Sequence, residues 1–133
     1  MTQHEMRTIA LQALYLANQS KTTDAEQVYE RAKNALNLKS FPDYSKTLLE
    51  GVLTNKENLD SELTSHLKKG WRLERLDSID RAILELGLYE MQNSKIIEPV
   101  AALNEALNLC DEFSSPKSKA FVNGVLANFV DRK

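Results

Sequence analysis

Hydrophobic residues along this chain recur every three or four positions, a spacing that predicts α-helices almost throughout. In the first half, four such stripes fall within residues 6–17, 28–36, 44–53 and 59–67. Asp24 is placed to cap the second predicted helix, and Asp43 or Tyr44 opens the third after the break at Pro42. We expect Gly70 to end the fourth helix in the left-handed conformation that glycine tolerates.

The second half contains three more helical patterns with clearer boundaries. Asp77 or Ser78 caps the first of them, and this helix should be the most enclosed because it carries apolar residues on two faces. Pro99 and Pro116 suit the first turn of the last two helices, and Ser115 supplies an N-cap for the second of these. The pattern therefore predicts an all-α bundle of six or seven helices.

Composition supports this prediction and removes several classes of protein. Gly and Pro together number 7 of 133 residues, about 5% where roughly 12% is usual, so a turn-rich sandwich or barrel is disfavoured. The single Cys110 excludes an internal disulfide and a multi-cysteine zinc site. The chain has no run of 18 apolar residues and no signal-peptide pattern at its start. We therefore expect a soluble cytoplasmic protein with one domain.

The charge balance gives little sign of a nucleic-acid partner. Lys and Arg number 17 and Asp and Glu number 19, for a net charge of −2, whereas nucleic-acid-binding proteins usually carry a basic excess. Only residues 68–75 (KKGWRLER) are locally basic. Trp71 in this run has two interpretations: a stacking surface flanked by cations, or a side chain that fills a gap between helices. The second is favoured from sequence.

Candidate catalytic groups are scattered rather than convergent. His4 and His66 have no partner at metal-binding spacing, and Cys110 lies on the apolar face of its helix. The four glycines stand alone, so no phosphate-binding loop is indicated. Gly87 and Gly124, inside helical patterns, instead predict close helix crossings. The sequence therefore predicts neither an enzyme nor a metal or cofactor site.

Several motifs, taken together and in order, resemble the NusB family of bacterial transcription antitermination factors. They are RTIALQALY (residues 7–15), LLEGVLTN (48–55), WRLERL (71–76), IDRAILELGLYEM (79–91), AALNEALNLCDEF (101–113) and SPKSKAFVNGVL (115–126). The resemblance covers nearly the whole chain, which also ends where the family ends. We therefore do not expect the catalytic domain of the RNA methyltransferases that carry a NusB-like domain.

The resemblance implies a fold and a function. The fold is all-α, with about seven helices in two packed small bundles, about 1–70 and 71–133, within one domain. The function is binding of the boxA element of nascent RNA, notably from ribosomal RNA operons, as a complex with the small-subunit ribosomal protein that doubles as NusE. That complex joins RNA polymerase and other Nus factors, without catalysis, cofactor, metal or membrane. Some relatives are thought to dimerise, so a homodimer of the free protein is a further expectation.

Five positions match RNA-facing residues of the family: Arg7, Tyr15, Lys117, Lys119 and Phe121. The aromatic ones offer ring faces on which bases stack. The two lysines stand in the first turn of the last helix, where a phosphate held at the helix N-terminus would offset their unfavourable position in the helix dipole.

The N-terminal segment departs from the family pattern. Gln3, His4 and Glu5 occupy places where relatives often carry arginine, and only Arg7 is kept. Each phosphate contact adds about 0.7 to the slope of log K against log salt. The loss of roughly three contacts therefore lowers that slope by about two. This departure motivates an alternative function: a helical protein-interaction adaptor with weak or no RNA binding of its own.

Three positions are candidates for contact with the NusE partner. Asp80 matches an acidic residue of the family that faces NusE, and Arg81 and Glu85 are expected to share that surface.

Overall fold

A computed structural model describes residues 1–130, which form seven α-helices and two short 3₁₀ turns. No strand occurs in that part of the chain, so the predicted all-α class is confirmed. The helices are α1 (Gln3–Ser20), α2 (Ala25–Leu36), α3 (Asp43–Thr54), α4 (Lys56–Thr64), α5 (Ser78–Asn93), α6 (Pro99–Phe113) and α7 (Pro116–Leu126). The turns are η1 (Leu73–Arg75) and η2 (Ala127–Phe129).

The predicted helix starts are confirmed, because each rests on local chemistry. Asp24, Asp77 and Ser115 each accept a backbone N–H from the first turn of the helix that follows, over 3.1 Å. Pro99 and Pro116 occupy first-turn positions of α6 and α7, where their missing N–H costs nothing.

One predicted helix end is wrong. The fourth helix stops at Thr64, where the Ser65 hydroxyl donates to the carbonyl of Glu62 over 2.7 Å and competes with helical pairing. Gly70 is left-handed as predicted, with φ of +89°, but it stands in a separate turn. The last helix ends at Leu126, and residues 127–129 continue as a 3₁₀ turn.

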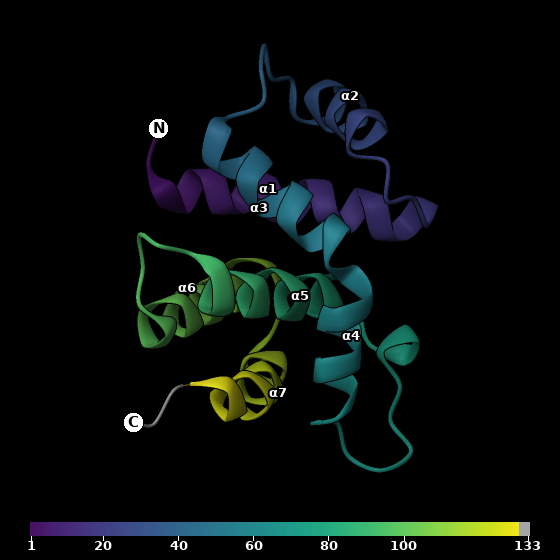
Figure 1. The fold of residues 1–133 in the computed structure, drawn as a ribbon, viewed down its shortest axis with the longest axis vertical. Helices are drawn as coiled ribbons and strands as arrows, with labels where there is room; N and C mark the ends of the chain where they lie inside the picture. Colours follow the sequence, from purple (N-terminus) through teal and green to yellow (C-terminus); the bar gives the residue numbers. More distant parts are fainter. Residues whose placement is uncertain (131–133) are drawn as a thin grey trace.

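Helix α5 lies at the centre of the molecule. It packs against α1, α3, α4, α6 and α7, and ten of its 16 residues are buried, which confirms it as the most enclosed helix. In Figure 1, α1, α2 and α3 lie on one side of α5, and α6 and α7 lie beside and beneath it. Helix α4 runs down the end of α5 and packs mainly on it.

Glycines adjust how closely the helices approach. A Cβ at Gly87 would lie 3.0 Å from a Leu126 methyl and 3.1 Å from the Ala106 Cβ, so the predicted close crossing with α6 and α7 is confirmed. Gly51, which the sequence did not single out, packs directly beneath the ring of Tyr89. At Gly124 the prediction is wrong, because nothing lies within 4 Å of a Cβ placed there.

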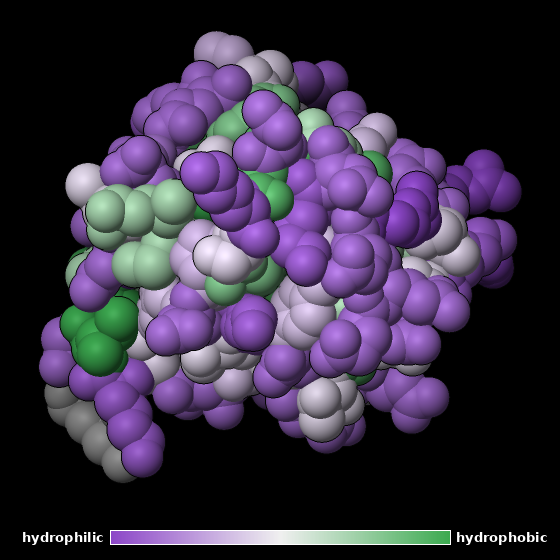
Figure 2. Space-filling model, turned by 90° about the horizontal axis from the view of Figure 1, so that it is seen from above, coloured by the Kyte–Doolittle hydropathy of each residue, from purple (hydrophilic) through white to green (hydrophobic). Residues whose placement is uncertain are grey.

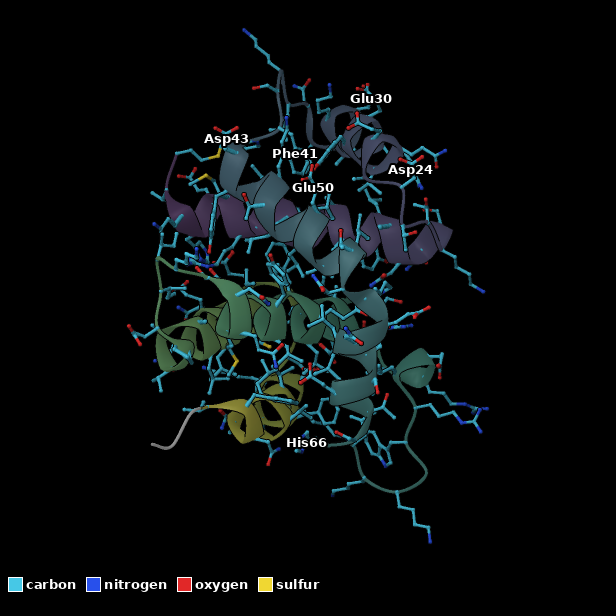
Figure 3. All side chains as sticks on the ribbon, in the orientation of Figure 1. Asp24, Glu30, Phe41, Asp43, Glu50 and His66 are labelled. Atoms are coloured by element: carbon cyan, nitrogen blue, oxygen red, sulfur yellow. The ribbon has the colours of Figure 1, made fainter. Side chains whose placement is uncertain are left out.

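Seen from the end that carries α2, the surface is mostly hydrophilic, with apolar side chains gathered along one edge (Figure 2). Helix α7 lies at the other end, below α5, where Figure 3 places His66 far from Phe41 and Asp43.

Candidate nucleic-acid interface

The start of α7 is held in place by Asp80 of α5. This carboxylate is 7% exposed, and its two oxygens accept hydrogen bonds of 2.6 Å from the hydroxyls of Ser114 and Ser118. Both serines flank the N-terminus of α7, so the contact fixes that terminus against the start of α5. As a result Lys117, in the first turn, is presented at the surface.

Two aromatic rings stack beside this helix start. The rings of Trp71 and Phe121 have centroids 5.6 Å apart and an interplanar angle of 24°. Trp71 is 51% exposed, so the favoured prediction that it fills a gap between helices is wrong. Trp71 could be buried only if core residues surrounded the 65–72 connection. Most of that segment is exposed, so the connection lies at the surface. The other interpretation, a stacking surface flanked by cations, fits the structure.

The rings form part of a pocket of about 630 Å³ between the 66–77 segment and α7, which we call the α7 pocket. Lys68, Arg75 and Lys117 line it, and none of the three has an ion-pair partner within residues 1–130. Of its two carboxylates, Asp80 is satisfied by serines and Asp77 caps α5. The α7 pocket is therefore an apolar surface with a positive rim, the combination that suits a base and its phosphates.

The other two RNA-site candidates on this side have different surroundings. Lys119 is 41% exposed and its ammonium lies 3.1 Å from the Asp111 carboxylate, so its charge is partly compensated. Tyr15 is half-buried and lines a second pocket, of about 440 Å³, with Phe113 and other apolar residues. Asp77 lines both pockets, which places the Tyr15 pocket next to the α7 pocket.

Arg7 is a buried structural residue. Its side chain is 3% exposed, and its Nε lies 2.9 and 2.8 Å from the two carboxylate oxygens of Glu90. The hydroxyl of Tyr44 also donates to Glu90, over 2.6 Å, and the guanidinium lies 5.9 Å from the Tyr44 ring centroid. Burial and the Glu90 carboxylate raise the pKa of Tyr44 to about 12. This placement does not fit the predicted contact with RNA phosphates.

The rest of the N-terminal segment adds no unpaired cationic side chain. His4 lies between two carboxylates of α6: its Nδ1 is 3.5 Å from Glu105, and its Nε2 contacts Glu112. Glu5 bonds back to Thr2 and closes a capping box at the start of α1. The segment therefore serves the helix start and its packing on α6.

The three candidates for partner contact are mostly internal. Glu85 is fully buried, accepts a 2.9 Å hydrogen bond from Asn18 and pairs with Lys56. Arg81 is 23% exposed and donates to Asp60 over 3.1 Å. Asp80 holds α7 as described above. The structure gathers the three on one end of α5 but leaves only Arg81 with appreciable exposure.

The predicted RNA-facing set left out the residues of the 68–75 loop, although a stacking surface at Trp71 was one of the two interpretations of that run. Lys68, Trp71 and Arg75 line the α7 pocket, and the local run of charge was the available signal. No cluster of three or more metal-binding side chains occurs in the described residues. No described helix is both long and apolar enough to cross a membrane.

Comparison with known proteins identifies the family. Residues 4–131 match the sequence profile of the NusB family. The transcription antitermination protein NusB of Lacticaseibacillus casei (strain BL23) is 43% identical over 129 residues, which cover 97% of this chain and 94% of the relative.

Two solved structures share the fold. T. maritima NusB superposes with a TM-score of 0.81 at 26% identity, covering 96% of this chain and 89% of that one. A structure of the antitermination factors NusB and NusE in complex with double-stranded RNA contains a chain that superposes with a TM-score of 0.79 at 26% identity, covering 96% of each. This chain therefore belongs to the NusB family.

Proposed function

We propose that this protein is a transcription antitermination factor that binds boxA-type RNA of nascent transcripts together with a NusE-type ribosomal protein. In this role it joins RNA polymerase and other Nus factors, notably on ribosomal RNA operons, in the bacterial cytoplasm. Membership of the NusB family and the name of its 43% identical relative support the proposal. No catalytic step, metal or cofactor forms part of it.

The observation that carries the proposal is the pairing of an aromatic ring with a free cation on one face of α7. Phe121 and Lys117 are four residues apart, so they lie on the same helix face, and both line the α7 pocket. A base stacked on the ring would bring its phosphate toward Lys117 and the N-terminus of α7. Tyr15 lies in the neighbouring pocket, Lys119 pairs with Asp111 of α6 outside the α7 pocket, and buried Arg7 is left out of this surface.

For the partner, we propose that the NusE-type protein docks on the end of α5 that carries Arg81. Of the three predicted contacts, Arg81 has the reach for a direct one. Asp80 and Glu85 are positioning residues, since their carboxylates are used inside the molecule by Ser114, Ser118, Asn18 and Lys56.

Fluorescence anisotropy with labelled RNA tests the proposal. The probes are a boxA-type single strand, a scrambled strand of the same length and the matching duplex, each at two salt concentrations, with and without the NusE-type protein. We expect a preference for the boxA-type strand that the partner strengthens and that added salt weakens. Sedimentation of the free protein tests the expected homodimer.

Phe121→Ala is the informative variant. Losing one stacked base costs about 1–3 kcal/mol, so RNA affinity should fall about 5- to 150-fold while affinity for the NusE-type protein is unchanged. Ile96→Ala is the matched control, because Ile96 is exposed in the α5–α6 connection and does not line the α7 pocket. If Phe121→Ala lowers helix content and both affinities together, Phe121 is a core residue.

A second candidate function rests on the burial of Arg7 and the pairing of His4, which leave the N-terminal segment without an unpaired cationic side chain. It is a protein-interaction adaptor that binds the NusE-type protein but no RNA. Partner binding without sequence-specific RNA binding, at both salt concentrations, would favour this alternative.

A further inference from the structure

The 68–75 loop carries an aromatic ring that the core of the protein does not enclose. Trp71 is 51% exposed, and its neighbours Lys69, Gly70 and Arg72 are exposed as well. Phe121 covers part of the indole by stacking, which holds the ring in a defined orientation on the α7 pocket. An exposed indole in a fixed orientation is a ready surface for another planar group.

The charge around this ring is positive on balance, since three cationic side chains and two carboxylates, Asp77 and Asp80, line the pocket. Lys68 and Arg75, from opposite ends of the loop, and Lys117, from α7, line the same pocket without an ion-pair partner in residues 1–130. The net charge of the chain is −2, so this concentration of cations is local. It complements an anion that passes across the rings.

We infer that the 68–75 loop is a second RNA-binding element, in which Trp71 stacks on an unpaired nucleobase and Lys68 and Arg75 contact the neighbouring phosphates. The inference rests on the proposed function and deepens it: the loop extends the Phe121 surface and supplies affinity that the N-terminal segment lacks. An acidic peptide would satisfy the cations but would leave the indole face without a planar partner. A single strand of RNA satisfies both.

The chain itself provides the probe, because Trp71 is its only tryptophan. Titration with a boxA-type single-stranded RNA should quench the fluorescence of Trp71, with a midpoint equal to the Kd from anisotropy of the labelled RNA. The matching duplex, whose bases are already stacked on each other, and polyglutamate should quench far less. Equal quenching by polyglutamate would show a site for acidic protein segments and overturn the inference.

Variants separate stacking from charge. Trp71→Ala should weaken binding of the single strand about 5- to 150-fold, and Trp71→Phe should retain most of the affinity. Lys68→Ala and Arg75→Ala should each lower the slope of log K against log salt by about 0.7. Lys39→Ala is the matched control: Lys39 is exposed in the α2–α3 connection, and Figure 3 places Phe41 and Asp43, at the end of that connection, far from His66, which lines the α7 pocket.

The outcomes distinguish this inference from the proposed function. If the RNA binds with normal affinity to Trp71→Ala and leaves the fluorescence of Trp71 unchanged, the loop is no RNA element, while the proposed function stands. If Trp71→Ala loses the NusE-type protein but keeps the RNA, the loop is a protein-docking site and the inference fails. If no RNA binds the unaltered protein, both fail.

Discussion

The ion pair between Arg7 and Glu90 ties the start of α1 to α5 at the level of single residues. Both side chains are almost fully buried, with 3% and 2% exposed, and two N–O distances of 2.9 and 2.8 Å join them. Removing one partner of such a pair leaves an uncompensated buried charge, which is far more costly than the pair is favourable.

We therefore predict that Arg7→Ala lowers the free energy of unfolding by about 3–5 kcal/mol, because Glu90 loses its counter-charge. Urea denaturation followed by circular dichroism measures this. The control is Arg31→Ala, an exposed arginine of α2, which should change stability by less than about 0.5 kcal/mol. Unchanged stability of Arg7→Ala together with weakened RNA binding would restore Arg7 to the RNA surface.

Arg7 and Trp71 show how far the burial and the partner of a single side chain can be predicted from the sequence. Arg7 stands three residues before Ala10 and seven before Leu14, on the buried stripe of α1, so its burial was readable from the helical period. Its partner Glu90 is 83 residues away, and no local pattern names it. Trp71 follows no helical period, and its exposure depends on how the 65–72 connection passes α7.

At the scale of whole helices, the starts could be predicted from the sequence and the ends less so. Starts rest on side-chain caps and first-turn prolines, which the sequence displays directly. Ends do not: α1 and α2 are followed by Lys21 and Asn37, both left-handed although neither is glycine. Backbone hydrogen bonds close these ends, because the N–H groups of Thr22 and Leu38 donate to the carbonyls of Ala17 and Lys33.

The two glycines within helices offer a matched prediction. Both Gly87→Ala and Gly124→Ala gain about 1 kcal/mol of helix propensity. At Gly124 nothing opposes this, whereas a Cβ at Gly87 meets the Ala106 Cβ, fixed to the α6 backbone, at 3.1 Å. Overpacking of this kind costs about 1–3 kcal/mol, so thermal unfolding should find Gly87→Ala less stable than Gly124→Ala by that amount. If the two substitutions raise stability equally, α6 and α7 move easily to make room for a Cβ at position 87.

The whole molecule is organised around α5, and the two packed groups of helices bury the only thiol of the chain. Cys110 on α6 is inaccessible, and burial, with the nearby charges of Asp80 and Asp111, raises its pKa to about 11. A buried and protonated thiol is a poor nucleophile.

We predict that a maleimide at pH 8 labels Cys110 only as fast as the protein unfolds, with mass spectrometry as the measurement. Labelling should accelerate in urea in step with the loss of helix. Ser61→Cys, at an exposed position of α4, serves as the reactive control and should be labelled at once. Rapid, complete labelling of the unaltered chain would show that α6 opens locally.

Stability of the whole molecule also depends on a carboxyl pair where α4 meets α5. Burial, followed by a hydrogen bond with Glu85, raises the pKa of Asp60 to about 7. Burial acts on Glu85 in the same sense, but the hydrogen bond with Asp60 and the charge of Lys56 outweigh it and lower the pKa of Glu85. The folded pair therefore holds a proton on Asp60 in a range where the unfolded chain has released it.

Unfolded Asp60 loses its proton near pH 3.8 and folded Asp60 near pH 7, so between these values the folded state binds the extra proton. By linkage, the contribution of Asp60 to stability is complete below about pH 4 and is lost as the pH rises through 7. Glu85, with its lowered pKa, is ionised in both states above about pH 6 and adds no slope there. Above about pH 6 the remaining decline at this junction, which levels off above about pH 7, is therefore assigned to Asp60.

We predict that Asp60→Asn, which mimics the protonated carboxyl, matches the unaltered protein near pH 4 and exceeds it in free energy of unfolding at pH 8. Urea titrations across this range give the two curves, which should diverge between about pH 4 and 7 and stay a constant distance apart above pH 7. Glu57→Gln, an exposed carboxylate of the same helix, should follow the unaltered protein at every pH. Only a difference between the curves counts, because the rest of the chain is the same in all three proteins. If the Asp60→Asn curve runs parallel to that of the unaltered protein, Asp60 is ionised throughout and the four charges at the junction balance one another.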